Sequence, residues 1–205
     1  WSLRQEAGYE IIRKDDEGAA GQVDYASREN TNPPQLAVEL GEPVPTVGAG
    51  LTAISDADVR SGSPNQNQGN RMRLQVQSSG NNRVLVQFDR QAMLAKVGSG
   101  TLQAAKLRLY VVSNANNWGS SGRAVNVHRM TQTWTEQGTT WNCANDLNPF
   151  NSQSDCTPNW NMSNSSQWPF VTAATHSIVQ QNSQTGWVEW DVTADVAQIL
   201  NSSVP

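Results

Sequence analysis

The sequence lacks the features that mark several common classes of protein. Lys and Arg number 14 against 18 Asp and Glu, a formal net charge of −4 at pH 7, so no basic stripe is available to bind nucleic-acid phosphates. No apolar run approaches the roughly 18 residues that a membrane-spanning helix needs. Charged residues make up only 16% of the chain, whereas Asn, Gln, Ser and Thr are abundant. This profile favours an all-β extracellular protein over a cytosolic helical enzyme.

Enzyme motifs are also missing. The chain has no HExxH, no Gly-x-Ser-x-Gly, no phosphate-binding loop and no Cys/His pairing. Its two histidines, His128 and His176, do not stand at zinc-ligand spacing. The acids at 15–17 could serve a glycosidase, but three adjacent acids before a glycine are more often a solvated turn. We therefore predict a protein that is not an enzyme and needs no cofactor.

Two carboxylates, those of Asp56 and Asp58, are the candidates for a metal site. They lie two residues apart on an expected strand, so they face the same way. With backbone carbonyls they could hold a structural calcium ion. Simple alternation of polar residues toward solvent also explains the pair, and is the plainer interpretation.

Cysteine is scarce, and its placement is informative. Cys143 and Cys156 flank a polar loop without regular periodicity. A disulfide there would stabilise the fold by about 3 kcal/mol, because it restricts the unfolded chain. The alternative is a pair of free thiols in a reducing cytosol. We predict the disulfide, and with it an extracellular or cell-surface location.

Alternation with a period of two dominates the rest of the chain and predicts strands. Side chains two apart face the same way on a strand, so each run offers one apolar face to a core. Gly, Asn and Ser clusters separate the runs. The expected inward-facing residues are Met72, Leu74, Val76, Val84, Val86, Phe88, Leu107, Leu109, Val111, Val125 and Val127. The pattern predicts an all-β fold, a β-sandwich with jelly-roll-like topology and one short helix at Thr193–Leu200, with Thr193 as its N-cap.

A boundary divides the chain into unequal parts. Residues 41–50 hold two prolines and three glycines and predict a linker, since Pro cannot donate to a strand ladder. Residues 51–205 form most of a sandwich, the body. Residues 1–40 amount to about three strands, too few to be stable alone. We therefore expect them to close a sandwich whose own closing strands are displaced.

A succession of motifs resembles a known family. In chain order they are Ile54–Asn65, Asn82–Asp89, Ala105–Val111, Val125–Met130, Trp134–Glu136 with Thr140–Asn142, and Trp187–Thr193. Together they resemble the DNRLRE domain family, extracellular β-sandwich modules found beside polysaccharide-degrading enzymes and in bacterial and archaeal surface proteins. In that family the closing strands follow the short helix. Here Arg13–Glu17, Tyr25–Glu29 and Pro33–Leu36 resemble them but come first. The resemblance implies a bacterial or archaeal surface protein.

The displaced strands leave three arrangements open. The chain could be one period of a tandem array, a circular permutant that closes on itself, or a subunit whose first strands complete the next copy. Our main hypothesis is a structural module joined head to tail to copies of itself by strand complementation. The expected donor side chains are Tyr9, Ile11, Val23, Tyr25, Leu36, Val38 and Leu40. Their burial would contribute about 10–20 kcal/mol to the stability of the join, before the entropy cost of ordering the strands is subtracted.

The alternative function is a self-contained carbohydrate-binding module with a polysaccharide partner. Eight tryptophans are many for a chain of this size, and an exposed indole stacks well on a sugar. Trp118, Trp160 and Trp168 lie in Asn/Ser-rich segments and are the candidates for stacking, although folding of these segments onto the sandwich would bury them. The tryptophans in motif positions, which are Trp134, Trp141, Trp187 and Trp190, are expected to pack in the core or on a sheet.

Overall fold

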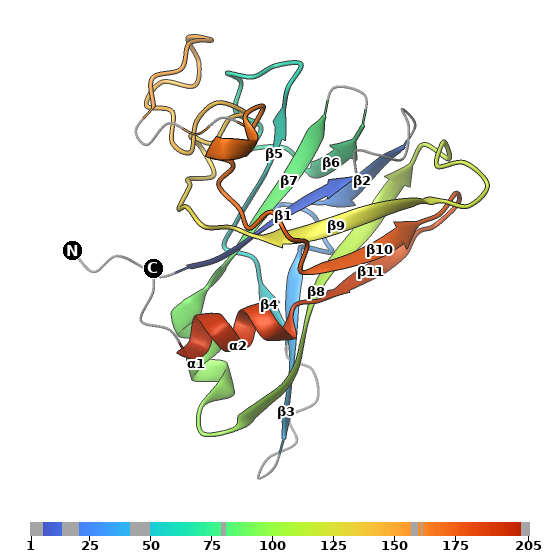
Figure 1. The fold of residues 1–205 in the computed structure, drawn as a ribbon, viewed down its shortest axis with the longest axis vertical. Helices are drawn as coiled ribbons and strands as arrows, with labels where there is room; N and C mark the ends of the chain where they lie inside the picture. The colour runs from blue at the N-terminus through green and yellow to red at the C-terminus, as the bar shows by residue number, and fades with distance from the viewer. Residues whose placement is uncertain are drawn as a thin grey trace.

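The computed structural model describes residues 6–13, 21–41, 50–78, 81–156, 160 and 162–201. Its strands pair antiparallel and form the two layers of a sandwich (Figure 1). The first layer is ordered β10 (His176–Gln180), β9 (Arg123–Arg129), β1 (Glu6–Arg13), β7 (Asn82–Asp89) and β5 (Ser55–Arg60). The all-β sandwich prediction is confirmed.

The second layer is built around the long strand β8 (Thr101–Asn114). On one edge of β8 lie β2 (Gln22–Ala26) and β3 (Gln35–Gly41), and on the other lies β11 (Gly186–Asp191). Strands β6 (Arg73–Gln77) and β4 (Leu51–Thr52) extend the layer beyond β2 and β3. The ladder passes from one layer to the other between β6 and β7, where only Gln77 and Asn82 pair.

The first three strands are built into the sandwich of the chain that carries them. Strand β1 lies between β7 and β9, so that Ile11 pairs with both Val84 and Val127. Strand β2 lies between β6 and β8. Of the seven expected donor side chains, six are buried and Leu40 packs against the core partly exposed. Completion of an adjacent copy by these strands stays a prediction.

The main core lies between the layers and follows the period-two pattern. Leu74, Val86, Leu107 and Val127 are fully buried, as strand alternation requires. Met72 is an exception, because it precedes the first residue of β6 and is 61% exposed. The expectation that Met72 faces inward is therefore wrong.

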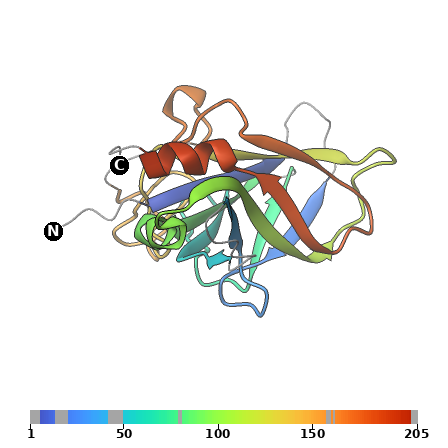
Figure 2. The ribbon, with the colours of Figure 1, turned by 90° about the horizontal axis from the view of Figure 1, so that it is seen from below.

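Two α-helices lie at one end of the sandwich, which Figure 2 views end on. Helix α2 (Thr193–Asn201) matches the expected helix and buries Val196. Its first N–H, that of Thr193, donates to Asp191 Oδ1, while the Thr193 hydroxyl accepts from the Ala105 N–H of β8. Asp191 therefore takes the capping role that we expected of Thr193. No helix among the described residues has the length and apolar character to span a membrane.

Helix α1 (Arg90–Val97) was not expected from the sequence. Asp89 caps it by accepting from the Gln91 N–H, and Gly98 ends it with a φ of 54°, which favours glycine. It buries only Met93, so it lacks the apolar stripe by which helices are found in a sequence.

The long segment between β9 and β10 folds against the outer face of the first layer. It carries a 3-10 helix, η1 (Ser165–Gln167), and forms a second apolar cluster on the outward side chains of β5 and β7. Leu85 lies at the base of this cluster, and the Arg83 guanidinium lies 4.9 Å from the ring centroid of Trp141. The segment contributes Met130, Trp134, Trp141, Ala144, Trp160, Met162 and Phe170. Trp134 and Trp141, and Trp190 in the main core, pack as expected.

Candidate functional site

A pocket of about 340 Å³ opens between two loops at the end of the sandwich away from α1 and α2. One wall is the loop between β5 and β6, which contributes Gln66, Asn67, Gln68, Asn70 and Arg71. The other is the loop closed by Cys143 and Cys156, which contributes Pro149, Phe150 and Ser152. None of the described residues that line the pocket carries a carboxylate.

The first wall is held from behind by backbone carbonyls. The Asn67 side-chain amide donates to the carbonyls of Glu136 and Thr139, at 2.7 and 2.8 Å, and its oxygen accepts from the Gly69 N–H. A Cβ at Gly69 would lie 2.1 Å from the Glu136 carbonyl oxygen, so only glycine fits there. This anchoring leaves the amides of Gln66 and Asn70 exposed on the pocket side.

The second wall is held by the disulfide, which confirms the predicted Cys143–Cys156 bond. Inside the loop, Leu147 N–H donates to the Asp155 carbonyl, and Asn148 N–H donates to Asp146 Oδ1. These contacts hold the segment that presents Phe150, although the disulfide lies behind it and does not line the pocket.

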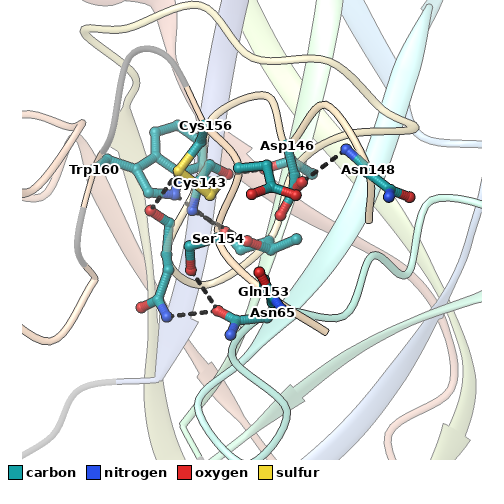
Figure 3. The surroundings of a disulfide bond; sticks show 12 residues. Asn65, Cys143, Asp146, Asn148, Gln153, Ser154, Cys156 and Trp160 are labelled. Carbon is teal, nitrogen blue, oxygen red and sulfur yellow. Dashed lines mark hydrogen bonds between the residues drawn. A yellow bond between two sulfur atoms is a disulfide. The ribbon is translucent and has the colours of Figure 1, made fainter. Parts of the chain in front are cut away.

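Asn65 joins the two walls (Figure 3). Its Nδ2 donates to the Ser152 carbonyl at 3.0 Å. Its Oδ1 accepts from Ser154 Oγ at 2.7 Å and from Asn142 Nδ2 at 2.8 Å. The relative position of the loops is therefore fixed by side-chain hydrogen bonds that start from a single residue.

Apolar side chains project at the rim. Phe150 is 91% exposed and lines the pocket, whereas Leu147, in the same loop, is 74% exposed and does not. An exposed aromatic ring contributes nothing to the core, so its apolar surface is available for burial against a ligand. Beside it lie amides that both donate and accept hydrogen bonds, and the guanidinium of Arg71. This set suits a ligand rich in hydroxyl groups with an apolar face.

Our sequence reasoning missed Phe150 because it considered only tryptophans for stacking. The available signal was an aromatic residue after Asn148-Pro149 inside a loop closed by cysteines. A large apolar residue at the tip of a loop that is closed by a disulfide cannot fold back into the core.

The predicted stacking residues lie elsewhere. Trp118 is fully buried and donates through Nε1 to Asn114 Oδ1, and Trp160 is 1% exposed and donates to the Thr140 carbonyl. Trp168 is partly buried and stacks on Phe170 with 5.0 Å between ring centroids. The structure thus offers no open indole face at Trp118 or Trp160, because the segments that carry them fold inward to complete the two cores.

The candidate metal ligands are buried rather than open. Asp56 Oδ2 accepts from the Arg28 N–H at 2.6 Å, and burial raises the pKa of Asp56 to about 8. Asp58 forms an ion pair with Arg60, and burial raises the pKa of its carboxyl as well. Over the described ranges, no three His, Cys, Asp or Glu residues gather closely enough to hold a metal ion. The acids at 15–17 lie outside the described residues.

Comparison with known proteins identifies the family. Residues 48–168, more than half of the chain and including both pocket walls, match the model of carbohydrate-binding module family 96. No curated protein and no solved structure matches the chain. The match supports the expected carbohydrate-binding-module-like family, while the DNRLRE resemblance stays a prediction. The chain belongs to carbohydrate-binding module family 96.

Proposed function

We propose that the chain is a non-catalytic module that binds a polysaccharide in the pocket between the β5–β6 loop and the disulfide-closed loop. The observation that carries this proposal is the exposed ring of Phe150 beside a wall of amides, within the segment that matches the family. A family of binding modules favours a binding role over an enzymatic one. The disulfide and the family together favour an extracellular location.

The chemistry of the pocket suits a sugar chain. The Phe150 ring can cover the C–H face of a pyranose, and its burial there would contribute about 1.5–3 kcal/mol. The exposed amides of Gln66 and Asn70 can pair with hydroxyls as donors and as acceptors. Because Asn65 and the disulfide fix the loops before binding, little ordering entropy is lost when the ligand binds.

The experiment is a binding screen with two matched variants. The chain is run through native gels that each contain a different soluble polysaccharide. The polysaccharide that slows its migration is then titrated into the protein by calorimetry. Phe150→Ala is expected to weaken binding about 10- to 100-fold, from the burial energy above. Leu147→Ala, a truncation of another exposed apolar side chain in the same loop, should leave binding unchanged. Equal losses in both variants, or none in Phe150→Ala, would refute the pocket as the binding site.

Head-to-tail assembly by strand complementation is the second candidate. Its support is the central position of β1 and β2, each between two strands of the body, although in this structure that body belongs to the same chain, which is the self-closing arrangement. The strands of 6–41 are covalently joined to the body only through residues 42–49, so exchange between copies would preserve every pairing. Size-exclusion chromatography with light scattering decides: the assembly hypothesis requires multiples of 22.4 kDa, and a monomer at all concentrations contradicts it.

A further inference from the structure

A second surface with aromatic and polar side chains lies on the outer face of the second layer, on β8 and β11. On these strands the inward side chains are buried, for example Leu107 and Val188. The outward side chains form three cross-strand pairs, and we call these six residues the β8–β11 face. The pairs are Tyr110 with Trp187, Arg108 with Glu189, and Lys106 with Asp191.

The aromatic end of the β8–β11 face is not required by either core. Trp187 and Tyr110 are both only partly buried and belong to neither apolar cluster. Their ring centroids lie 5.4 Å apart in an edge-to-face contact. The Arg108 guanidinium lies 4.8 Å from the centroid of the Trp187 ring. These contacts fix the orientation of an indole on a rigid strand.

The polar end carries balanced charge. Glu189 accepts from Lys106 Nζ at 3.2 Å and from Arg108 Nε at 2.9 Å. Arg108 also donates through a terminal nitrogen to Gln35 Oε1 on β3, at 3.4 Å. Two cations thus stand among two carboxylates, those of Glu189 and Asp191. A charged ligand would meet a repelling group at each step along the face, whereas hydroxyl groups find both donors and acceptors.

We propose that the β8–β11 face is a second binding surface, separate from the pocket, for a neutral linear polysaccharide. Trp187 stacks on the sugar with the ring face opposite the Arg108 guanidinium, and Arg108, Glu189 and Lys106 hydrogen-bond hydroxyls along the polysaccharide. Trp187, Glu189 and Asp191 lie outside residues 48–168, so the family match covers only the β8 half of this surface. With two surfaces on one chain, a long polysaccharide that reaches both would bind more tightly than either surface alone allows.

The competing explanation is that the three pairs only stabilise the sheet, each by about 0.2–1 kcal/mol. An experiment must therefore report ligand contact at Trp187 and not stability alone. Proton–nitrogen correlation spectra of the full chain resolve the indole N–H groups of its eight tryptophans. The peak missing from the Trp187→Phe spectrum identifies Trp187.

The probes are cellohexaose, xylohexaose, mannohexaose and laminarihexaose, with polygalacturonate as the anionic comparison. At least one neutral hexaose should move the Trp187 peak, both in the native chain and in Phe150→Ala, which removes the pocket's ring. In the Phe150→Ala background, Trp187→Ala should lower the affinity for that hexaose at least about tenfold, because one stacking contact is lost. Trp187→Phe, which keeps a ring, should lower the affinity less. Val179→Ala, at an exposed position on β10, should leave the affinity unchanged.

Three results would overturn the proposal. They are no movement of the Trp187 peak with any neutral hexaose at 10 mM, movement that disappears in Phe150→Ala, or tighter binding of polygalacturonate than of every neutral hexaose at Trp187. The pocket is judged separately, since its own test depends on Phe150 and Leu147. Polysaccharide binding that Phe150→Ala weakens, with a stationary Trp187 peak, would support the pocket and refute the second surface.

Discussion

Asp56 makes the stability of the fold depend on pH in an unusual direction. The side chain is 1% exposed, and burial raises its pKa from 3.8 to about 8, an effect that the hydrogen bond from the Arg28 N–H opposes. The nearby carboxylates of Glu29 and Glu136 raise the pKa further. The folded state therefore favours the protonated form, whereas the unfolded chain ionises above its ordinary pKa.

The sign follows from linkage. The folded pKa lies above the unfolded one, so the folded state binds more protons between about pH 4 and 8, and the free energy of unfolding falls as pH rises through that window. The maximum slope is about 1.4 kcal/mol per pH unit. Between pH 5 and 8 we expect Asp56 to remove about 2–4 kcal/mol, a sizeable share of the stability of an ordinary domain.

Asp56→Asn tests this directly. Asparagine keeps an acceptor for the Arg28 N–H but does not titrate. Urea unfolding at pH 5, 6.5 and 8 should show a difference, variant minus native, that grows by about 2–4 kcal/mol toward pH 8. Asp191→Asn is the control, because the Thr193 hydrogen bonds lower the pKa of this exposed carboxyl, so it stays ionised throughout the range. A pH-independent difference for Asp56→Asn would refute the reasoning.

Three further predictions concern the structures that hold the pocket and the core. Reduction of the Cys143–Cys156 disulfide should lower the urea-derived free energy of unfolding by about 3 kcal/mol and weaken polysaccharide binding, and unchanged binding would show that the bond does not hold the pocket wall. Gly69→Ala forces a Cβ to within 2.1 Å of a backbone oxygen and should lower the melting temperature strongly, whereas Gly62→Ala, with nothing within 4 Å, should not. Ile11→Ala should cost about 2–5 kcal/mol in chemical unfolding, and a cost below 1 kcal/mol would contradict its place in the core.

The strands and the disulfide could be predicted because their signals are local. Alternation in Leu107–Val111 reflects one face in the main core and one partly exposed face, whereas both faces of Val84–Phe88 are buried, one in each apolar cluster. Two cysteines in one polar loop need no tertiary information. The strands of residues 9–40 were expected from the resemblance to the family's closing strands, and their expected donor side chains are inside the sandwich, with only Leu40 partly exposed.

The candidate site could not be predicted in the same way, because it depends on how loops far apart in sequence meet. Nothing local shows that Asn65 hydrogen-bonds Ser152 and Ser154, so the pocket between their loops has no sequence signature. Indole exposure is equally non-local: Trp118 and Trp160 lie in polar segments yet are buried, because those segments fold back onto apolar surfaces.

The most direct measurement is a map of the bound polysaccharide on the chain. Backbone chemical-shift changes should be recorded with the polysaccharide whose binding Phe150→Ala weakens. We predict that the largest changes cluster in residues 66–71 and 149–152, the two walls of the pocket. If no polysaccharide meets that condition, or if those residues stay unperturbed while others shift, the pocket is not the binding site of this module.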